Sequence, residues 1–366
     1  MHLGRFNSLL NNLNIEFETL KVANLFQTLI DKLRAAVANQ SNSEIANQFK
    51  TELETFRQSL NTSKFNNLRP IEKMMLDSIG AHKVIGNSLF ERVMRTIESN
   101  QISPAVAIDE LVKLQQEIQI YYKNISTLLS TFNSLVIEYD DIEEGGAEIG
   151  LLLPKDENKS TLGDFSKELK DWEKILNPIN QTFDENRTPV QIKNCATTDW
   201  TIFLYSSVPT IYGVYLCLAA VNKVLTESLK TKELLALLAT RKISTPTMDS
   251  LRSEVDTELK SELRKEADTL VDNNFKGDDG TKNELKNALS QALSRLSLKI
   301  SLGAKIEVKL MPKPQKSESS EQTSDENTKK IEAYAKEIND NIEKLSFKED
   351  LEKVRALIPF SEDDDE

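Results

Sequence analysis

Glycine and proline are scarce in this sequence. Among its 366 residues there are 11 glycines and 10 prolines. A protein built from many short strands needs turn residues about every 8–12 positions, and this chain has too few of them. The scarcity argues against a many-stranded β fold and favours long helices joined by few turns.

Cysteine and histidine are also scarce, with two of each. Neither Cys195 nor Cys217 belongs to a CxxC pair, and Cys217 lies in an apolar stretch that is typical of a small buried side chain. A nucleophilic site that needs a histidine would have to use His82, because His2 is at the end of the chain. This cysteine usage favours a reducing compartment. The first residues also lack the order of a signal peptide, so we expect a cytoplasmic protein.

Positive charge is in deficit, and the net charge is −12. Nucleic-acid binding depends on lysine and arginine that neutralise phosphates, and no basic run overrides the acidic background. The same deficit argues against anionic membrane surfaces. We therefore expect no nucleic-acid partner, and an acidic surface that mainly supports solubility.

Known catalytic motifs are absent as well. The sequence contains no Walker A loop, no GxGxxG, no HExxH and no GxSxG. The loop at 272–284 faintly resembles a calcium loop, but Lys276 occupies a ligand position, so we reject that interpretation. The acidic run at 140–144 and the acidic tail are expected to be solvated. We predict no catalytic residue, no metal ligand and no cofactor, and we expect that the protein is not an enzyme.

Apolar residues at helical spacing dominate the first part of the chain, which predicts a helical bundle or coiled-coil-like domain over residues 1–140. One helix is expected from Pro70 to Asn100, with His82 on its apolar seam. Another begins at Pro104 and has a seven-residue repeat, as in coiled coils or antiparallel bundles. That repeat consists of Ile108, Leu111, Ile118, Tyr121, Ile125, Leu128, Phe132, Leu135 and Tyr139.

The pattern changes after residue 146, and we predict a small α/β or α+β domain over 147–311. Short apolar runs and helical stripes alternate in the order β-α-β-β-α, with one strand predicted at Thr201–Tyr205 and a capping box at Thr161 and Asp164 before the first helix. A helical insertion is expected at 231–295. From Leu298 to Leu310 apolar and polar residues alternate strictly, which predicts either a late β-hairpin with its loop at Gly303–Lys305 or one long strand bent at Gly303. We favour the hairpin. The expected fold class is therefore mainly α with a small α+β unit.

Residues 200–222 carry no charge and are numerous enough to span a bilayer. A transmembrane helix is one interpretation. The other is a strand that ends near Ser206 and a core helix that begins at Pro209, with Ser206 and Ser207 as caps. Polar residues inside the run and the lack of a flanking basic cluster favour the second interpretation.

The end of the chain is expected to contain a disordered linker at 312–328, an amphipathic helix at 329–358 and an acidic tail at 359–366. A helix beyond a linker must bury its apolar stripe on its own chain, on a partner or on a second copy. We expect a non-catalytic interaction or scaffold protein, a subunit of a bacterial-type intracellular assembly that acts through amphipathic helices. The alternatives are a regulatory module that binds a small ligand or nucleotide at the central α/β unit, and an effector that associates with membrane through 200–222. The predicted interaction surface consists of Ile118, Ile125, Phe132, Ile338 and Ile342.

Overall fold

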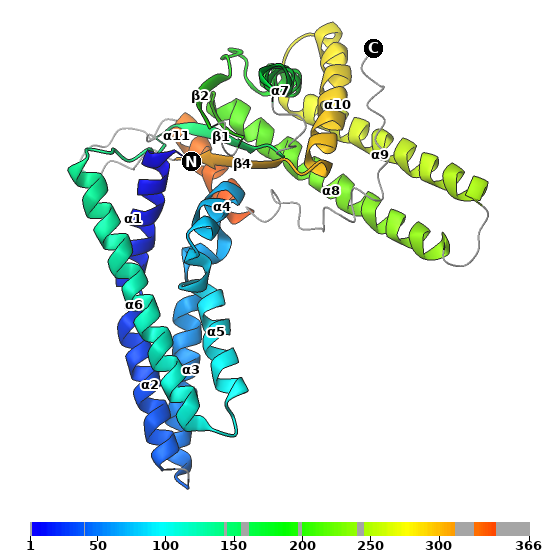
Figure 1. The fold of residues 1–366 in the computed structure, drawn as a ribbon. Helices are drawn as coiled ribbons and strands as arrows, with labels where there is room; N and C mark the ends of the chain where they lie inside the picture. The colour runs from blue at the N-terminus through cyan, green and yellow to red at the C-terminus, as the bar shows by residue number, and fades with distance from the viewer. Residues whose placement is uncertain are drawn as a thin grey trace. The chain divides into compact units, whose positions relative to one another are not determined.

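The computed structural model describes residues 2–39, 41–142, 145–154, 161–196, 200–239, 245–311 and 326–341. The chain divides into two units, Met1–Asp141 and Ile142–Glu366, and each is described by itself. Over the described residues unit 1 is helical, and unit 2 combines helices with a four-stranded sheet (Figure 1). The predicted fold class, mainly α with a small α+β unit, is confirmed.

Unit 1 is a helical bundle. Its helices are α1 (Leu3–Thr19), α2 (Val22–Ala38), α3 (Ser43–Asn61), α4 (Pro70–Ser78), α5 (Gly86–Ser99) and α6 (Pro104–Ser134), with 3-10 turns η1 (Lys64–Asn67) and η2 (Ala81–Lys83). Helix α6 runs alongside α1 and α2, and α3 and α5 complete the bundle (Figure 1). At its centre the rings of Phe26 and Phe56 meet edge to face with centroids 5.4 Å apart. Both side chains are buried, as expected for the inner stripe of an amphipathic helix.

The single helix predicted from Pro70 to Asn100 is wrong. The structure has two helices, α4 and α5, joined through η2. Gly80 and Gly86 adopt φ of 72° and 64°, a left-handed conformation that glycine tolerates and that ends an α-helix. His82 therefore leaves the expected seam. Its side chain is 45% exposed, and its Nδ1 lies 3.1 Å from an oxygen of Asp77.

Asn66 joins the end of α3 to the beginning of α5. Its side-chain amide donates to the carbonyl oxygens of Leu60 at 2.9 Å and Asn61 at 3.2 Å. Its Oδ1 accepts from the backbone N–H of Asn87 at 2.7 Å. One side chain thus satisfies carbonyls at one helix end and an N–H at another, groups that have no partner within their own helices.

Unit 2 contains an antiparallel sheet in the order β2-β3-β1-β4. Its strands are β1 (Ala147–Leu152), β2 (Gln191–Ala196), β3 (Thr201–Tyr205) and β4 (Lys305–Leu310). Its helices are α7 (Leu162–Phe183), α8 (Val208–Ala239), α9 (Thr245–Asn274), α10 (Asp279–Ser301) and α11 (Glu326–Asp340). The predicted order β-α-β-β-α is confirmed by β1, α7, β2, β3 and α8. The predicted capping box of α7 is also present, because Thr161 and Asp164 exchange side-chain to backbone hydrogen bonds.

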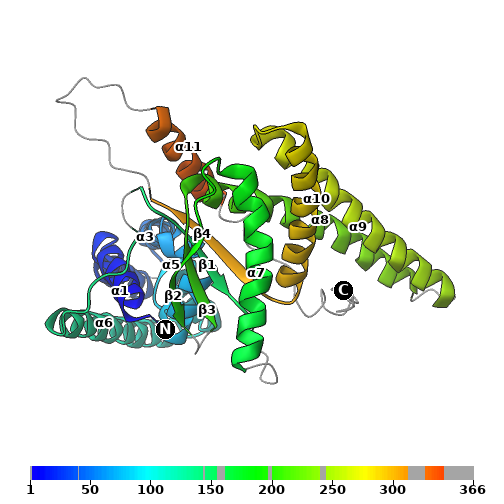
Figure 2. The ribbon, with the colours of Figure 1, turned by 90° about the horizontal axis from the view of Figure 1, so that it is seen from above.

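The core of unit 2 lies between one face of the sheet and the helices. Ile149, Ile202 and Val308 are fully buried on three neighbouring strands, and they belong to one apolar cluster with residues of α7, α8 and α10. Figure 2 shows α7 and α10 on the same side of the sheet. Alternate residues of a strand point to the same face of a sheet. The apolar residues that share a face with Ile149, Ile202 and Val308 therefore form a layer beneath the helices.

The outermost strand β2 is irregular. Its pairing with β3 shifts register between Ile192 and Asn194, so Lys193 is an extra residue on β2. Two residues that oppose one across a ladder define a β-bulge, which bends a strand and interrupts its row of backbone groups.

The late β-hairpin predicted around Gly303 is wrong, because residues 298–301 form the last turn of α10 and only Lys305–Leu310 is a strand. Backbone hydrogen bonds from Gly303 and Ala304 back to Ile300 and Lys299 close the helix, and Gly303 adopts φ of 103°. The alternating residues also satisfy the helical period, since Leu293, Leu296 and Ile300 are all buried in α10. β4 then pairs antiparallel with β1.

Candidate interaction site

Helix α8 begins at Val208, one residue before the predicted Pro209, and has a polar first turn. The side-chain oxygens of Ser207 and Thr210 lie 2.9 Å apart, and the Thr210 N–H donates to Ser207 Oγ at 3.4 Å. Ser207 is therefore a cap of α8. The side chain of Thr210 also donates to Asn180 Oδ1 of α7 at 2.9 Å, which fixes this end of α8 against α7.

One turn further along α8, two tyrosines form the contact with α11. The ring of Tyr212 stacks on the ring of Tyr334 with centroids 3.7 Å apart and planes 10° apart, and it also lies beside the ring of Tyr215, 5.8 Å away. The Tyr212 hydroxyl donates to Oε2 of Glu337 at 2.8 Å. Stacked aromatic rings stabilise a contact beyond their buried area, and the hydrogen bond fixes the register of α11 on α8.

Helix α11 packs on α8 and β4 through one apolar stripe. Ala335 and Ile338 are buried in the core of unit 2, and Ile338 has no exposed surface. Ile331 and Tyr334 are partly buried against the same core. This spacing of three, four and seven residues is that of one face of an α-helix. We call the surface of α8 and β4 under α11, including Tyr212 and Tyr215, the α11-docking surface.

Burial raises the pKa of the Tyr212 phenol above its ordinary value, and the hydrogen bond to Glu337 raises it further. Burial also raises the pKa of Tyr215, with the charge of Glu337 as the second cause. Both phenols thus remain neutral hydrogen-bond donors well into alkaline solution. On the outer side, Lys330 Nζ lies 5.7 Å from the centroid of the Tyr334 ring, a cation–π distance.

The structure separates the predicted interaction residues. Ile118, Ile125 and Phe132 are buried inside unit 1, where α6 packs against α1, α2 and α5. The Phe132 ring meets the ring of Phe6 edge to face, with centroids 6.4 Å apart. These three side chains have a packing role in the chain, and their part in binding a partner stays a prediction. Ile338 lies at the α11-docking surface, and Ile342 lies outside the described residues.

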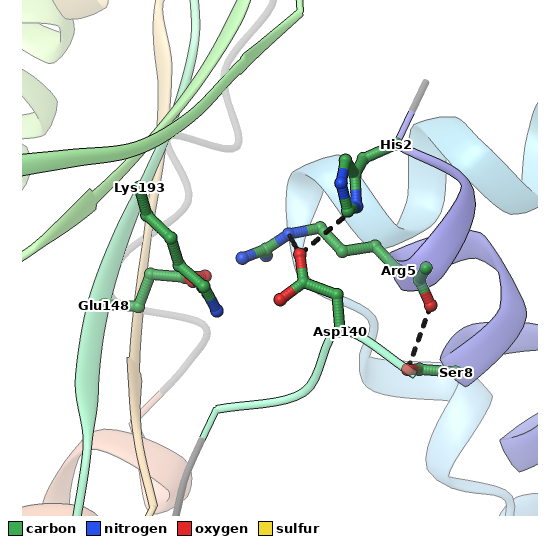
Figure 3. A network of polar contacts seen from close by, with 7 residues as sticks. His2, Arg5, Ser8, Asp140, Glu148 and Lys193 are labelled. Carbon is green, nitrogen blue, oxygen red and sulfur yellow. Dashed lines mark hydrogen bonds and ion pairs between the residues drawn. The ribbon is translucent and has the colours of Figure 1, made fainter. Parts of the chain in front are cut away.

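Carboxylates that could suggest a metal site have basic neighbours instead. In unit 1, Asp140 Oδ2 lies 3.1 Å from Arg5 Nε and 3.2 Å from His2 Nδ1 (Figure 3). In the sheet of unit 2, Glu148 lies 3.4 Å from Lys193 Nζ. Among the described residues, no three or more histidine, cysteine, aspartate or glutamate side chains are grouped to hold a metal ion.

Asp272, from the loop that faintly resembles a calcium site, pairs with two lysines. Its Oδ1 lies 2.9 Å from Lys282 Nζ and 2.8 Å from Lys286 Nζ. These two ammonium groups lower the pKa of Asp272. They also occupy the directions in which a cation would need carboxylate oxygens.

The uncharged stretch at 200–222 is a strand followed by a helix, as the favoured interpretation predicts. Among the described helices, Val208–Thr231 of α8 has the length and apolar composition to cross a membrane, and 61% of its most apolar window is buried in the structure. Cys217, on this helix, is buried as predicted. The all-round apolar character of α8 thus fits a helix packed against the sheet, α7 and α9.

Sequence reasoning found Ile338 of the α11-docking contact but missed Tyr212 and Tyr215. The residues of α11 form an amphipathic stripe, which identifies the face that is buried. Helix α8 is apolar on nearly all sides, so its sequence does not distinguish the face that receives α11. Comparison with protein families, with curated proteins and with solved structures finds no significant match to this chain.

Proposed function

We propose that this chain is a non-catalytic interaction protein that acts through amphipathic helices, and that the α11-docking surface is its helix-binding site. The observation that supports the proposal is the packing of α11 itself. A single helix, separated from β4 by residues 311–325, lays one apolar stripe on the rest of unit 2. Binding of an amphipathic helix to an apolar surface through residues at three-, four- and seven-residue spacing is a common recognition mode.

The contact combines the chemistry that such recognition needs. Ile338 supplies a fully buried anchor, Tyr334 supplies a flat aromatic contact, and Glu337 accepts a directed hydrogen bond from Tyr212. Buried apolar anchors give affinity, because they remove apolar surface from water. The hydrogen bond gives specificity, because a partner without an acceptor would leave the half-buried phenol unpaired.

A protease-cleavable version of the full chain tests the proposal. A cleavage sequence is inserted within residues 312–325, the folded protein is cut, and the released segment from residue 326 onward is labelled and titrated back. We expect saturable rebinding with a Kd on the order of micromolar, a modest affinity for a single short helix. The Ile338→Asp segment should not rebind, whereas the matched Lys336→Ala segment should, because Lys336 is exposed.

Circular dichroism of the cut protein serves as the folding control. If the larger fragment keeps its melting transition and yet does not bind the wild-type segment, the α11-docking surface is not a helix receptor and the proposal is wrong. If both variant segments bind as well as the wild type, the binding does not use the stripe of α11.

A further inference from the structure

The α11-docking surface is already filled by a helix of the same chain. Ile338 occupies the buried anchor position, and Tyr334 covers the ring of Tyr212. A second helix cannot use the same positions at the same time, because packed side chains leave no room for another residue. Any partner helix must therefore compete with α11.

We infer that α11 is an intramolecular competitor that masks the binding site until a partner helix of matching chemistry displaces it. This inference rests on the proposed function. The partner is expected to be an amphipathic helix of another protein that reproduces what α11 presents. The pattern in α11 consists of apolar Ile331, aromatic Tyr334 three positions later, and small Ala335 directly after it. Acidic Glu337 and the apolar anchor Ile338 complete it.

Displacement is feasible because α11 is held by few deep contacts. Within the described part of α11, Ala335 and Ile338 are the buried side chains, while Ile331 and Tyr334 keep part of their surface in solvent. The helix is 15 residues long, at the upper limit of the length of about 12–15 residues below which isolated helices are marginal in water. Its order thus depends on docking, and its release exposes the whole α11-docking surface at once.

The tether sets the strength of the competition. A helix joined by a short connection reaches an effective concentration on the order of 1 mM at its own site. For a helix with an intrinsic Kd of about 10 µM, this competitor weakens binding of an external copy by about 100-fold. Masking of this size would keep the site closed at low partner concentration while leaving it accessible to a tighter partner.

A fluorescent peptide with the sequence of residues 326–341 tests the inference on the full chain. The peptide is titrated by anisotropy against the wild-type protein and against the Ile338→Asp protein, whose own α11 cannot dock. We expect the variant to bind the peptide at least tenfold more tightly than the wild type. Tyr212→Ala added to the variant should abolish this binding, whereas Lys336→Ala in the full chain should leave the weak wild-type binding unchanged.

Equal tight binding to wild type and variant would show that the site is not masked, and the inference would be wrong even though the proposed function stands. If the Ile338→Asp protein loses its melting transition, the protease-cut wild-type protein replaces it, since cutting removes the tether without changing a buried side chain. Cut and uncut proteins that bind the peptide equally would likewise overturn the inference.

Native mass by sedimentation separates the remaining alternative. A wild-type dimer that becomes a monomer on Ile338→Asp substitution would mean that α11 of a second copy fills the site. That result would overturn the inference, because α11 would then mask the site of a second copy and not the site of its own chain. A monomeric wild type supports the inference.

Discussion

Replacing Ile338 by alanine should release α11 from unit 2 without unfolding the rest of the chain. Ile338 has no exposed surface, so the substitution removes most of a buried aliphatic side chain. Such changes cost about 2–5 kcal/mol, depending on how far the surroundings settle into the gap. Helix α11 lies at the edge of the core and can settle, so we expect about 2–3 kcal/mol, the lower part of that range.

Hydrogen exchange followed by mass spectrometry measures this effect on the segment itself. Local opening of α11 governs exchange of its amides, since this helix depends on docking for its order. A cost of about 2–3 kcal/mol should speed exchange in residues 326–341 by about 30- to 140-fold. Exchange in the buried strands β1 and β3 should not change, because opening of α11 leaves their pairing intact.

Lys336→Ala provides the matched control. Lys336 lies on the same helix and is exposed, and lysine and alanine differ little in helix propensity. In the Lys336→Ala protein the amides of α11 should exchange at the wild-type rate. If the Ile338→Ala and Lys336→Ala proteins exchange alike, α11 is not held by its apolar stripe, and the reasoning behind the α11-docking surface is refuted.

Three further predictions concern other parts of the structure. Asn66→Ala should lower the free energy of unfolding in urea by about 1–3 kcal/mol, because it removes the hydrogen bonds to the Leu60 and Asn61 carbonyls and from the Asn87 N–H. An unchanged midpoint would contradict this. Val136, just after α6, has φ of 55°, a strained angle for a β-branched residue. Val136→Gly should raise the melting temperature, because it relieves about 1–2 kcal/mol of backbone strain. A lower melting temperature would contradict the strain. Burial raises the pKa of Tyr122 above 10.0, its ordinary value, so its contribution to stability is fully present below about pH 10 and is lost as pH rises further. Stability measured from pH 9 to pH 11 should therefore fall less steeply in Tyr122→Phe than in the wild type, and equal slopes would argue against this role.

Much of the fold could be predicted from the sequence where a pattern has one structural solution. The strand predicted at Thr201–Tyr205 has those bounds in the structure, because apolar β-formers there are followed by a serine cap and a proline. The capping box at Thr161 identified the beginning of α7 in the same way. Such local signals need no knowledge of tertiary contacts.

One error occurred where both the two-residue period of a strand and the 3.6-residue period of a helix fit the same residues. From Leu298 to Ile300 the alternation of apolar residues suits a strand, but Leu293, Leu296 and Ile300 also form a helical stripe, and packing on α7 stabilises the helix. The stripe through His82 runs across Gly80 and Gly86 as if they were small residues of one helix, but their left-handed conformations end one helix and begin the next. The pattern of apolar residues cannot reveal a backbone reversal that tertiary packing stabilises.

The candidate site shows a second limit of sequence reasoning. One half, the stripe of α11, is visible because polar residues surround it. The other half, Tyr212 and Tyr215, lies on a helix with apolar residues on nearly every side, so no periodicity marks the receiving face. Which face of α8 meets α11 is decided by the sheet, α7 and α9, which cover the other faces.

The extra residue in β2 has a consequence for how this protein behaves at high concentration. A straight strand that arrives from solution can match the backbone groups of Gln191 and Ile192, or those from Asn194 onward, but not both, since Lys193 offsets one half from the other. Pairing of this edge strand with a strand of another molecule would therefore stop after a few hydrogen bonds. Such pairing is the first step toward fibres.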